Sequence, residues 1–345
     1  MIPIQNIYYM LSYAFQVLNE QGYKNIATEQ FHNTAELMAA ILEKGIAIQL
    51  KRGLGKEYIP QTEALSSLRG KIDIAESIKT QSMLRKQLIC TYDEFSVNSI
   101  MNRIIKSTVE LLLRSNISKQ RKKNLRKLMV YFSEVDFIDL YTVNWNVQYN
   151  RNNQTYRMLI SICYLVVKGL LQTQSNGHTK LMDFLDEQRM CRLYEKFILE
   201  YYRKEFKNQI TANASQIPWQ LDNEENSMLP VMQSDIMLQS GEKVLIIDAK
   251  YYEHSTQVQF DKHTLHSGNL YQIFTYVKNK EYELREKDHT VSGMLLYAKT
   301  DEEIYPNNVY QMSGNQIAVR TLDLNLPFDE IASQLNTIAK THFDL

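Results

Sequence analysis

The sequence predicts an α/β chain of the mixed α+β type, and three stretches of its 345 residues carry that prediction. Residues 228–252 alternate as two β-strand arms around a turn, which is the pattern of a hairpin. Residues 100–113 and 187–206 repeat apolar side chains at helical spacing. With 44% hydrophobic residues the chain can bury more than one core, so we expect two domains.

The first domain is expected to span residues 1–152 and to combine helices with short strands. Asn6 is placed to cap a first helix, residues 34–44 predict a second, and residues 100–113 predict a third. Alternation and glycines between residues 50 and 74 predict short strands with basic side chains, which is typical of a solvated sheet edge. Asn102 lies off the apolar stripe of the third helix, and we expect it to tie the strands to that helix.

The second domain, residues 153–345, is expected to hold a central mixed sheet flanked by helices. We assign the apolar helix at residues 156–171 to this domain, ahead of a polar break at residues 172–179. Besides the hairpin, strands are expected at residues 291–297 and 317–324, with helices at residues 187–206 and from residue 267 onward. Pro327 is expected to begin a terminal helix.

The hairpin within residues 228–252 brings acidic side chains together. A two-residue loop at Gly241 pairs Ile236 with Ile247, and therefore sets Asp235 opposite Asp248. Directly opposed residues share a sheet face and lie roughly 5 Å apart at their Cβ atoms. Because strand side chains alternate, Lys250 lies on the same face as Asp248.

Two carboxylates this close repel each other unless a cation lies between them, and Mg²⁺ suits such oxygen ligands. We therefore predict that Asp235 and Asp248 bind Mg²⁺ and that Lys250 orients or deprotonates an attacking water beside a phosphate. The spacing Asp-x(12)-Asp-x-Lys resembles the signature of the PD-(D/E)xK nuclease superfamily. The alternative is a solvated ion pair at a strand end, which four apolar residues directly before Asp248 disfavour.

Other charged residues are weaker candidates. Glu195 lies at the margin of the helical stripe at residues 187–206; it is either a surface charge or a third acidic metal ligand. Lys122, Lys123 and Arg126 belong to a cationic run, which is either a solvated helix face or a contact for nucleic-acid phosphates. Lys262, in a polar loop after the hairpin, is a further candidate contact for nucleic acid.

Composition limits the class of partner. Acidic and basic residues balance at 39 each, so binding of nucleic acid would need local basic faces or a partner protein. The three cysteines lie far apart in sequence, which suits a reducing compartment and gives no zinc-binding spacing. Residues 7–18 are too few and too polar to span a bilayer, so we expect a cytoplasmic protein that does not bind membranes.

Five segments carry a resemblance to a known family. They read Ile-Pro-Ile-Gln-Asn-Ile-Tyr-Tyr-Met-Leu from residue 2, Leu-Arg-Gly-Lys-Ile-Asp from residue 68, Asn-Arg-Ile-Ile-Lys from residue 102, Ile-Ile-Asp-Ala-Lys-Tyr-Tyr from residue 246 and Asn-Leu-Tyr-Gln from residue 269. In this combination and order they resemble McrC, the nuclease subunit of the modification-dependent McrBC restriction systems. The resemblance covers nearly the whole chain.

That resemblance implies a Mg²⁺-dependent endonuclease that cuts double-stranded DNA carrying 5-methylcytosine. The N-terminal domain would dock on a McrB-like AAA+ hexamer, which binds GTP, and would stimulate GTP hydrolysis there. In related nucleases the catalytic motif matches Asp235, Asp248 and Lys250, and a Gln-x-x-x-Tyr helix matches Gln272 and Tyr276. In the same class, the helix before the sheet often supplies a further acidic ligand, which here is Glu195.

One residue departs from the superfamily pattern, and two other functions stay open. Ser234 stands where a proline often precedes the first aspartate. The chain could be a non-catalytic adaptor of an AAA+ ring with a degenerate nuclease core, although its motif is intact. It could also be an autonomous PD-(D/E)xK nuclease of repair or transposition, although the family-like N-terminal segments disfavour this.

Overall fold

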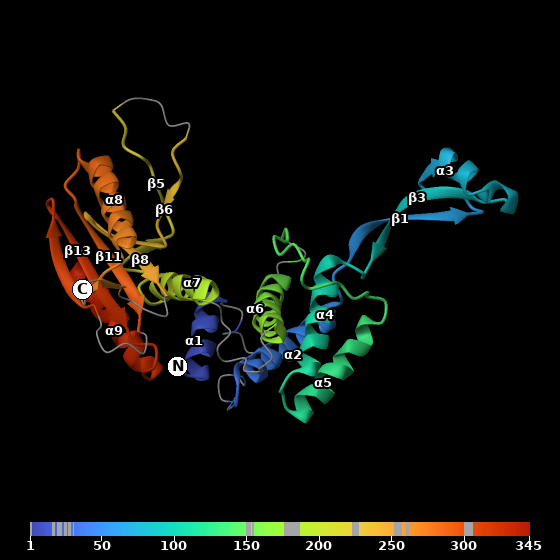
Figure 1. Cartoon of the computed structure of the whole chain (residues 1–345), viewed down its shortest axis with the longest axis horizontal. Coiled ribbons are helices and arrows are strands. Elements are labelled where there is room, and N and C mark those ends of the chain that lie inside the picture. Colours follow the sequence, from blue (N-terminus) through green and yellow to red (C-terminus); the bar gives the residue numbers. More distant parts are fainter. Residues whose placement is uncertain are drawn as a thin grey trace. The chain divides into compact units, whose positions relative to one another are not determined.

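The computed structural model describes the chain except residues 1, 16–17, 19–22, 24–25, 27–28, 30, 150–152, 154, 176–186, 223–227, 252–256, 260–261 and 300–305. The side chains of residues 168–175, 187–189, 257–259 and 262–263 also lie outside the description. The described residues are mixed α+β, as the sequence predicts (Figure 1). Among them no helix is both long and apolar enough to cross a membrane.

The chain divides into two compact units. This division differs from the expected one, which placed a single boundary between residues 152 and 153. One unit is residues 29–184, and the other combines residues 1–28 with residues 185–345. Helix α6 (Tyr156–Ser175) packs on α2 (Thr34–Arg52) and α4 (Ile100–Arg114), so it belongs to the first of these units. Helix α1 (Ile4–Ala14) packs on α7 (Glu187–Glu205) and so belongs to the second.

The unit of residues 29–184 joins a helical body to a small sheet. The body contains α2, α4, α6 and α5 (Lys119–Met129), and a short 3₁₀ helix follows α5 at Val130–Phe132. The antiparallel sheet has the order β1-β3-β2, formed by β1 (Glu57–Leu65), β3 (Leu88–Ser96) and β2 (Lys71–Asp73). Between β2 and β3 lie α3 (Ile74–Lys79) and the 3₁₀ turn Ser82–Arg85, at the far end of this sheet, which extends from the helices as an arm (Figure 1).

Asn102 fastens the base of that arm to the helices, as the sequence predicts. Its buried side chain donates from Nδ2 to the carbonyl oxygens of Gly55 at 2.9 Å and Val97 at 2.8 Å. Gly55 precedes β1 and Val97 follows β3. The Tyr156 hydroxyl donates to Asn102 Oδ1 at 2.8 Å and accepts from the Gly55 amide at 2.6 Å.

The other unit is built on a six-stranded mixed sheet with the order β12-β13-β11-β8-β7-β4. Strands β8, β11 and β13 are parallel to one another, while β7, β4 and β12 pair antiparallel with their neighbours. The six strands are β4 (Thr211–Asn213), β7 (Ile236–Ser240), β8 (Lys243–Lys250), β11 (Thr290–Ala298), β12 (Asn308–Met312) and β13 (Asn315–Leu322). This unit also contains two short antiparallel ribbons. One pairs β5 (Gln216–Ile217) with β6 (Met232–Gln233), and the other pairs β9 (Gln257–Gln259) with β10 (Lys262–Thr264).

Helices flank this sheet, as expected. Helix α8 (Ser267–Leu284) packs on β8, β11 and β13, α9 (Phe328–Phe343) packs on β13, and α7 packs on β7 and β8 (Figure 1). Gly293 in β11 permits the close approach of α8, because a Cβ there would lie 2.8 Å from side-chain carbons of Ile273 and Val277. Pro327 caps α9 rather than occupying its first turn.

The N-terminal helix is held to this unit by aromatic rings and by Asn6. Tyr13 stacks on Phe328 with ring centroids 5.7 Å apart and meets Phe197 of α7 edge-on. Asn6 lies inside α1, and Pro3 occupies the cap position, so the expected capping role for Asn6 is wrong. Its side-chain amide instead donates hydrogen bonds to two carbonyl oxygens of the loop between β13 and α9.

Candidate active site

The β7–β8 hairpin has the register that its turn predicts. Ile236 pairs with Ile247, and Gly241 adopts a φ of 55° in the two-residue loop. Asp235 lies in the bend just before β7, and Asp248 lies in β8. The Asp235 carboxylate accepts a hydrogen bond of 2.9 Å from the Ala249 amide, which fixes it against β8 beside Asp248.

Asp248 is a buried carboxylate with one cationic neighbour. The residue is 1% exposed, and its Oδ2 lies 2.9 Å from the Lys250 ammonium. This contact is an ion pair of poor hydrogen-bond geometry, because neither Asp248 oxygen accepts a well-angled hydrogen bond from any described residue. A buried carboxylate left in this state is costly unless another group completes its coordination.

The carboxyl groups shift one another's pKa values. Burial raises the pKa of Asp248 to about 7 against the pull of the Lys250 ammonium, and the charge of Asp235 adds to the rise. Burial also raises the pKa of Asp235, while the Ala249 amide and Lys250 oppose that rise. A cation bound between two adjacent carboxyl groups stabilises the ionised form of both. Two neighbouring carboxyl groups with raised pKa values are therefore a candidate cation site.

Helix α8 brings the predicted glutamine and tyrosine to the same place. Lys250 Nζ lies 3.4 Å from Gln272 Oε1, at the long end of hydrogen bonding. Gln272 Nε2 donates to the Tyr276 hydroxyl at 3.0 Å. The helical spacing of four residues stacks these two side chains on one face, so a polar chain runs from Asp248 through Lys250 into α8.

Glu195 approaches the same carboxylates from α7. The charge of Asp235 adds to the rise in the Glu195 pKa that burial causes, and both residues line one cleft. The Cys191 thiol donates to Glu195 Oε1 at 3.1 Å and holds that carboxylate in place. Among the described residues, no group of three or more His, Cys, Asp and Glu is gathered closely enough to hold a metal by itself.

Ser234 has a role at the site that the sequence analysis did not predict. It is buried, and its amide donates to the Ser215 carbonyl oxygen at 3.0 Å. Its hydroxyl accepts from the Ser215 amide at 3.3 Å and donates to the Ser215 carbonyl at 3.2 Å. These bonds fix the chain immediately before Asp235. The presence of serine where a proline is common was the one feature of the sequence that could have pointed to them.

The predicted nucleic-acid contacts do not join this cluster. Lys262 lies in β10, but its side chain is outside the described residues. Lys122, Lys123 and Arg126 lie on α5, in the unit that does not contain the hairpin. Lys123 and Arg126 are exposed, and Lys122 is half-buried.

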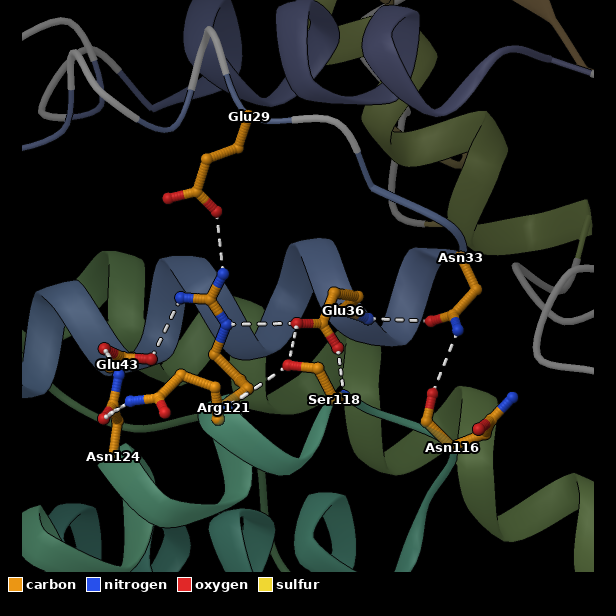
Figure 2. A network of polar contacts seen from close by, with 9 residues as sticks. Glu29, Asn33, Glu36, Glu43, Asn116, Ser118, Arg121 and Asn124 are labelled. Atoms are coloured by element: carbon orange, nitrogen blue, oxygen red, sulfur yellow. Dashed lines mark hydrogen bonds and ion pairs between the residues drawn. The ribbon is translucent and has the colours of Figure 1, made fainter.

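The neighbouring Arg121 has a structural role in α5 (Figure 2). Its guanidinium forms three ion pairs, at 2.7 Å, 3.3 Å and 3.0 Å, with Glu29, Glu36 and Glu43. Ser118 also binds Glu36, through its amide at 2.7 Å and its hydroxyl at 2.9 Å. This network fastens α5 to α2, and the other cations of the run are exposed except the half-buried Lys122.

The donor set of the hairpin fits a hard divalent cation. Both Asp248 oxygens are buried without a well-angled hydrogen bond from the described residues, and Asp235 stands beside them. Carboxylate oxygens with space for water or phosphate oxygens are what Mg²⁺ prefers.

Comparison with known proteins places the chain in a family. Residues 5–298 match the family of the McrBC 5-methylcytosine restriction system component. The chain belongs to this McrBC family. Among relatives, it is 29% identical over 340 residues to the type IV methyl-directed restriction enzyme EcoKMcrBC of Escherichia coli K12, covering 97% of this chain and 96% of that relative.

Two solved structures show more distant likenesses to this McrBC family chain. One is a half-complex from a tetradecameric assembly of Thermococcus gammatolerans McrB AAA+ hexamers with bound McrC, at 18% identity and a TM-score of 0.48, covering 97% of this chain and 76% of that one. The other is the McrBC complex of the same organism, at 21% identity and a TM-score of 0.41, covering 59% of each chain. Neither TM-score is high enough to establish a shared fold.

Proposed function

We propose that this McrBC family chain is the Mg²⁺-dependent DNA endonuclease subunit of a GTP-driven complex that cuts DNA containing 5-methylcytosine. The observation that carries the proposal is the pair of buried carboxylates, Asp235 and Asp248, with Lys250 at 2.9 Å from Asp248. Family membership supplies the restriction context. An arrangement built only for stability would favour apolar residues at so buried a position.

Each site residue has a role in this proposal. Asp235 and Asp248 would hold Mg²⁺, with Glu195 as a further acidic ligand on the α7 side. A bound Mg²⁺ supplies Lewis-acid activation of the scissile phosphodiester and of the attacking water. Lys250 orients that water and offsets negative charge that develops on the phosphate. Gln272 and Tyr276 position the Lys250 ammonium from α8.

The other unit is proposed to bind the partner, a McrB-like AAA+ hexamer that itself binds GTP. Its β1–β3 arm exposes seven large apolar side chains: Tyr58, Leu68, Ile74, Ile78, Met83, Leu84 and Phe95. Exposed apolar residues concentrated in one part of a surface are typical of protein-binding sites. Lys122, Lys123 and Arg126 on α5 are proposed to contact DNA phosphates.

The test uses the full chain together with its ring partner, methylated plasmid, GTP and Mg²⁺. Asp248→Ala and Lys250→Ala are expected to abolish cutting while GTP hydrolysis by the partner is still stimulated. If both variants cut as the wild type does, the hairpin is structural and the chain is a non-catalytic adaptor. Efficient cutting of unmethylated DNA by the chain alone would instead indicate an autonomous nuclease.

A further inference from the structure

A cleft of about 410 Å³ opens beside the hairpin, on the side of Asp235 that faces α7. Its floor is the chain from Gln233 to Asp235 together with Ala214. One wall of the cleft is α7, which contributes residues that lie three or four positions apart on one face of the helix: Arg192, Glu195, Lys196 and Leu199. The cleft therefore joins two of the proposed metal ligands to two cations.

The two cations are presented differently. Arg192 is exposed, and its positive charge opposes the rise in the pKa of the Glu195 carboxyl group. The Lys196 ammonium lies 3.9 Å from the centroid of the Phe15 ring, a cation–π contact that holds it at the cleft wall. Arg192 is thus an exposed cation at the cleft, and Lys196 is held at the cleft wall.

Charge balance shows what the cleft would take. Without a metal, Glu195 and Asp235 balance Arg192 and Lys196, so the lining has no net charge. Once a divalent cation is held by the carboxylates, the lining carries a net positive charge, since the cation adds to Arg192 and Lys196. The cleft then favours a second anion next to the one at the metal, and DNA supplies such anions along each strand.

We propose that Arg192 and Lys196 bind the backbone phosphate next to the phosphodiester that is cut, on the same DNA strand. This inference rests on the proposed nuclease function. Arginine offers a planar fork for two phosphate oxygens, while the lysine acts as a point charge. Holding the neighbouring phosphate would fix the strand so that the scissile group lies against the hairpin.

The experiment measures binding of a short labelled DNA duplex by the full chain in Ca²⁺, a hard cation that suits the same oxygen ligands. Arg192→Ala and Lys196→Gln are each expected to weaken binding by about tenfold at low salt. Each is also expected to reduce the slope of log affinity against log salt by about 0.9, because one phosphate contact is lost. Arg192→Lys should keep the wild-type slope, since the charge is retained.

The matched control is Lys207→Ala, which removes the same charge from an exposed position beyond the end of α7. Its slope should equal that of the wild type. Unchanged slopes in both Arg192→Ala and Lys196→Gln would overturn the proposal, as would an equal loss in the Lys207 control. The nuclease assignment fails separately, if Asp248→Ala still cuts in the ring complex.

Discussion

The Asn6 side-chain amide donates a hydrogen bond of 2.8 Å to the carbonyl oxygen of Leu324, 318 residues further along the chain. The same nitrogen donates at 2.8 Å to the carbonyl of Leu326. Asn6 is 4% exposed, so both bonds are shielded from water. The first helix is therefore part of the unit that holds the candidate active site.

Replacing Asn6 with alanine should weaken this unit. Two carbonyl oxygens would lose their donor, and we expect the free energy of unfolding to fall by about 1–3 kcal/mol. Urea denaturation of the full chain measures the change, with Asn208→Ala at an exposed turn as the control. Equal stability of the Asn6→Ala variant and the wild type would show that the two bonds contribute nothing.

Tyr156→Phe should loosen the base of the β1–β3 arm. The lost hydroxyl accepts from the Gly55 amide and donates to Asn102. We expect faster hydrogen exchange at Gly55 and the first residues of β1, with stability lower by about 1–2 kcal/mol. Tyr141→Phe, at an exposed position, is the control and should leave exchange there unchanged. Unaltered exchange in Tyr156→Phe would contradict the fastening role.

Ser234→Pro should damage the site although it restores the common superfamily residue. Proline has no amide hydrogen, so the bond from the Ser234 amide to the Ser215 carbonyl would be lost. Ser234→Ala keeps that amide and loses only the hydroxyl bonds, so its effect should be smaller. Thermal melting and cleavage in the ring complex rank the two variants. Wild-type behaviour of Ser234→Pro would show that the Ser215 bond is dispensable.

The raised pKa of Asp248 predicts a pH dependence of stability in metal-free protein. Its ordinary value is 3.8 and its folded value is about 7, so the folded state binds the proton more tightly than the unfolded state. Stability from this group is complete below pH 3.8 and is lost as the pH rises toward 7. The melting temperature should therefore fall as the pH rises from 3.8 to about 7, by roughly several degrees.

Asp248→Asn removes this titration, so its fall in melting temperature over the same range should be smaller. Adding Mg²⁺ at pH 8 should raise the melting temperature of the wild type and have little effect on the variant. Asp288→Asn, at an exposed position, controls for loss of one acidic charge. A pH profile of Asp248→Asn that matches the wild type would rule out this residue as the source.

The cations of α5 give a prediction about DNA. Changing Lys122, Lys123 and Arg126 together to glutamine should weaken DNA binding by the full chain and reduce its salt dependence. Stability should change little, because the Arg121 network that fastens α5 is untouched. Fluorescence anisotropy over a salt series measures the effect. If affinity and slope both stay at wild-type values, these residues form only a solvated face.

Local patterns in the sequence determined the hairpin and its chemistry. The two-residue loop at Gly241 determined the register, because loop length sets which residues of a hairpin pair. That register sufficed to set Asp235 beside Asp248 and Lys250. The spacing of Gln272 and Tyr276 likewise followed from helical geometry alone.

Only the tertiary structure decided where distant segments belong. Helical periodicity identifies α1 and α6, but it cannot say which apolar surface each helix covers, so both were assigned to the wrong compact unit. Asparagine is a common helix-capping residue, yet the hydrogen-bond partners of Asn6 are carbonyl oxygens more than 300 residues away in sequence. The roles of Ser234 and Arg192 also depend on neighbours brought together by folding, which no local pattern encodes.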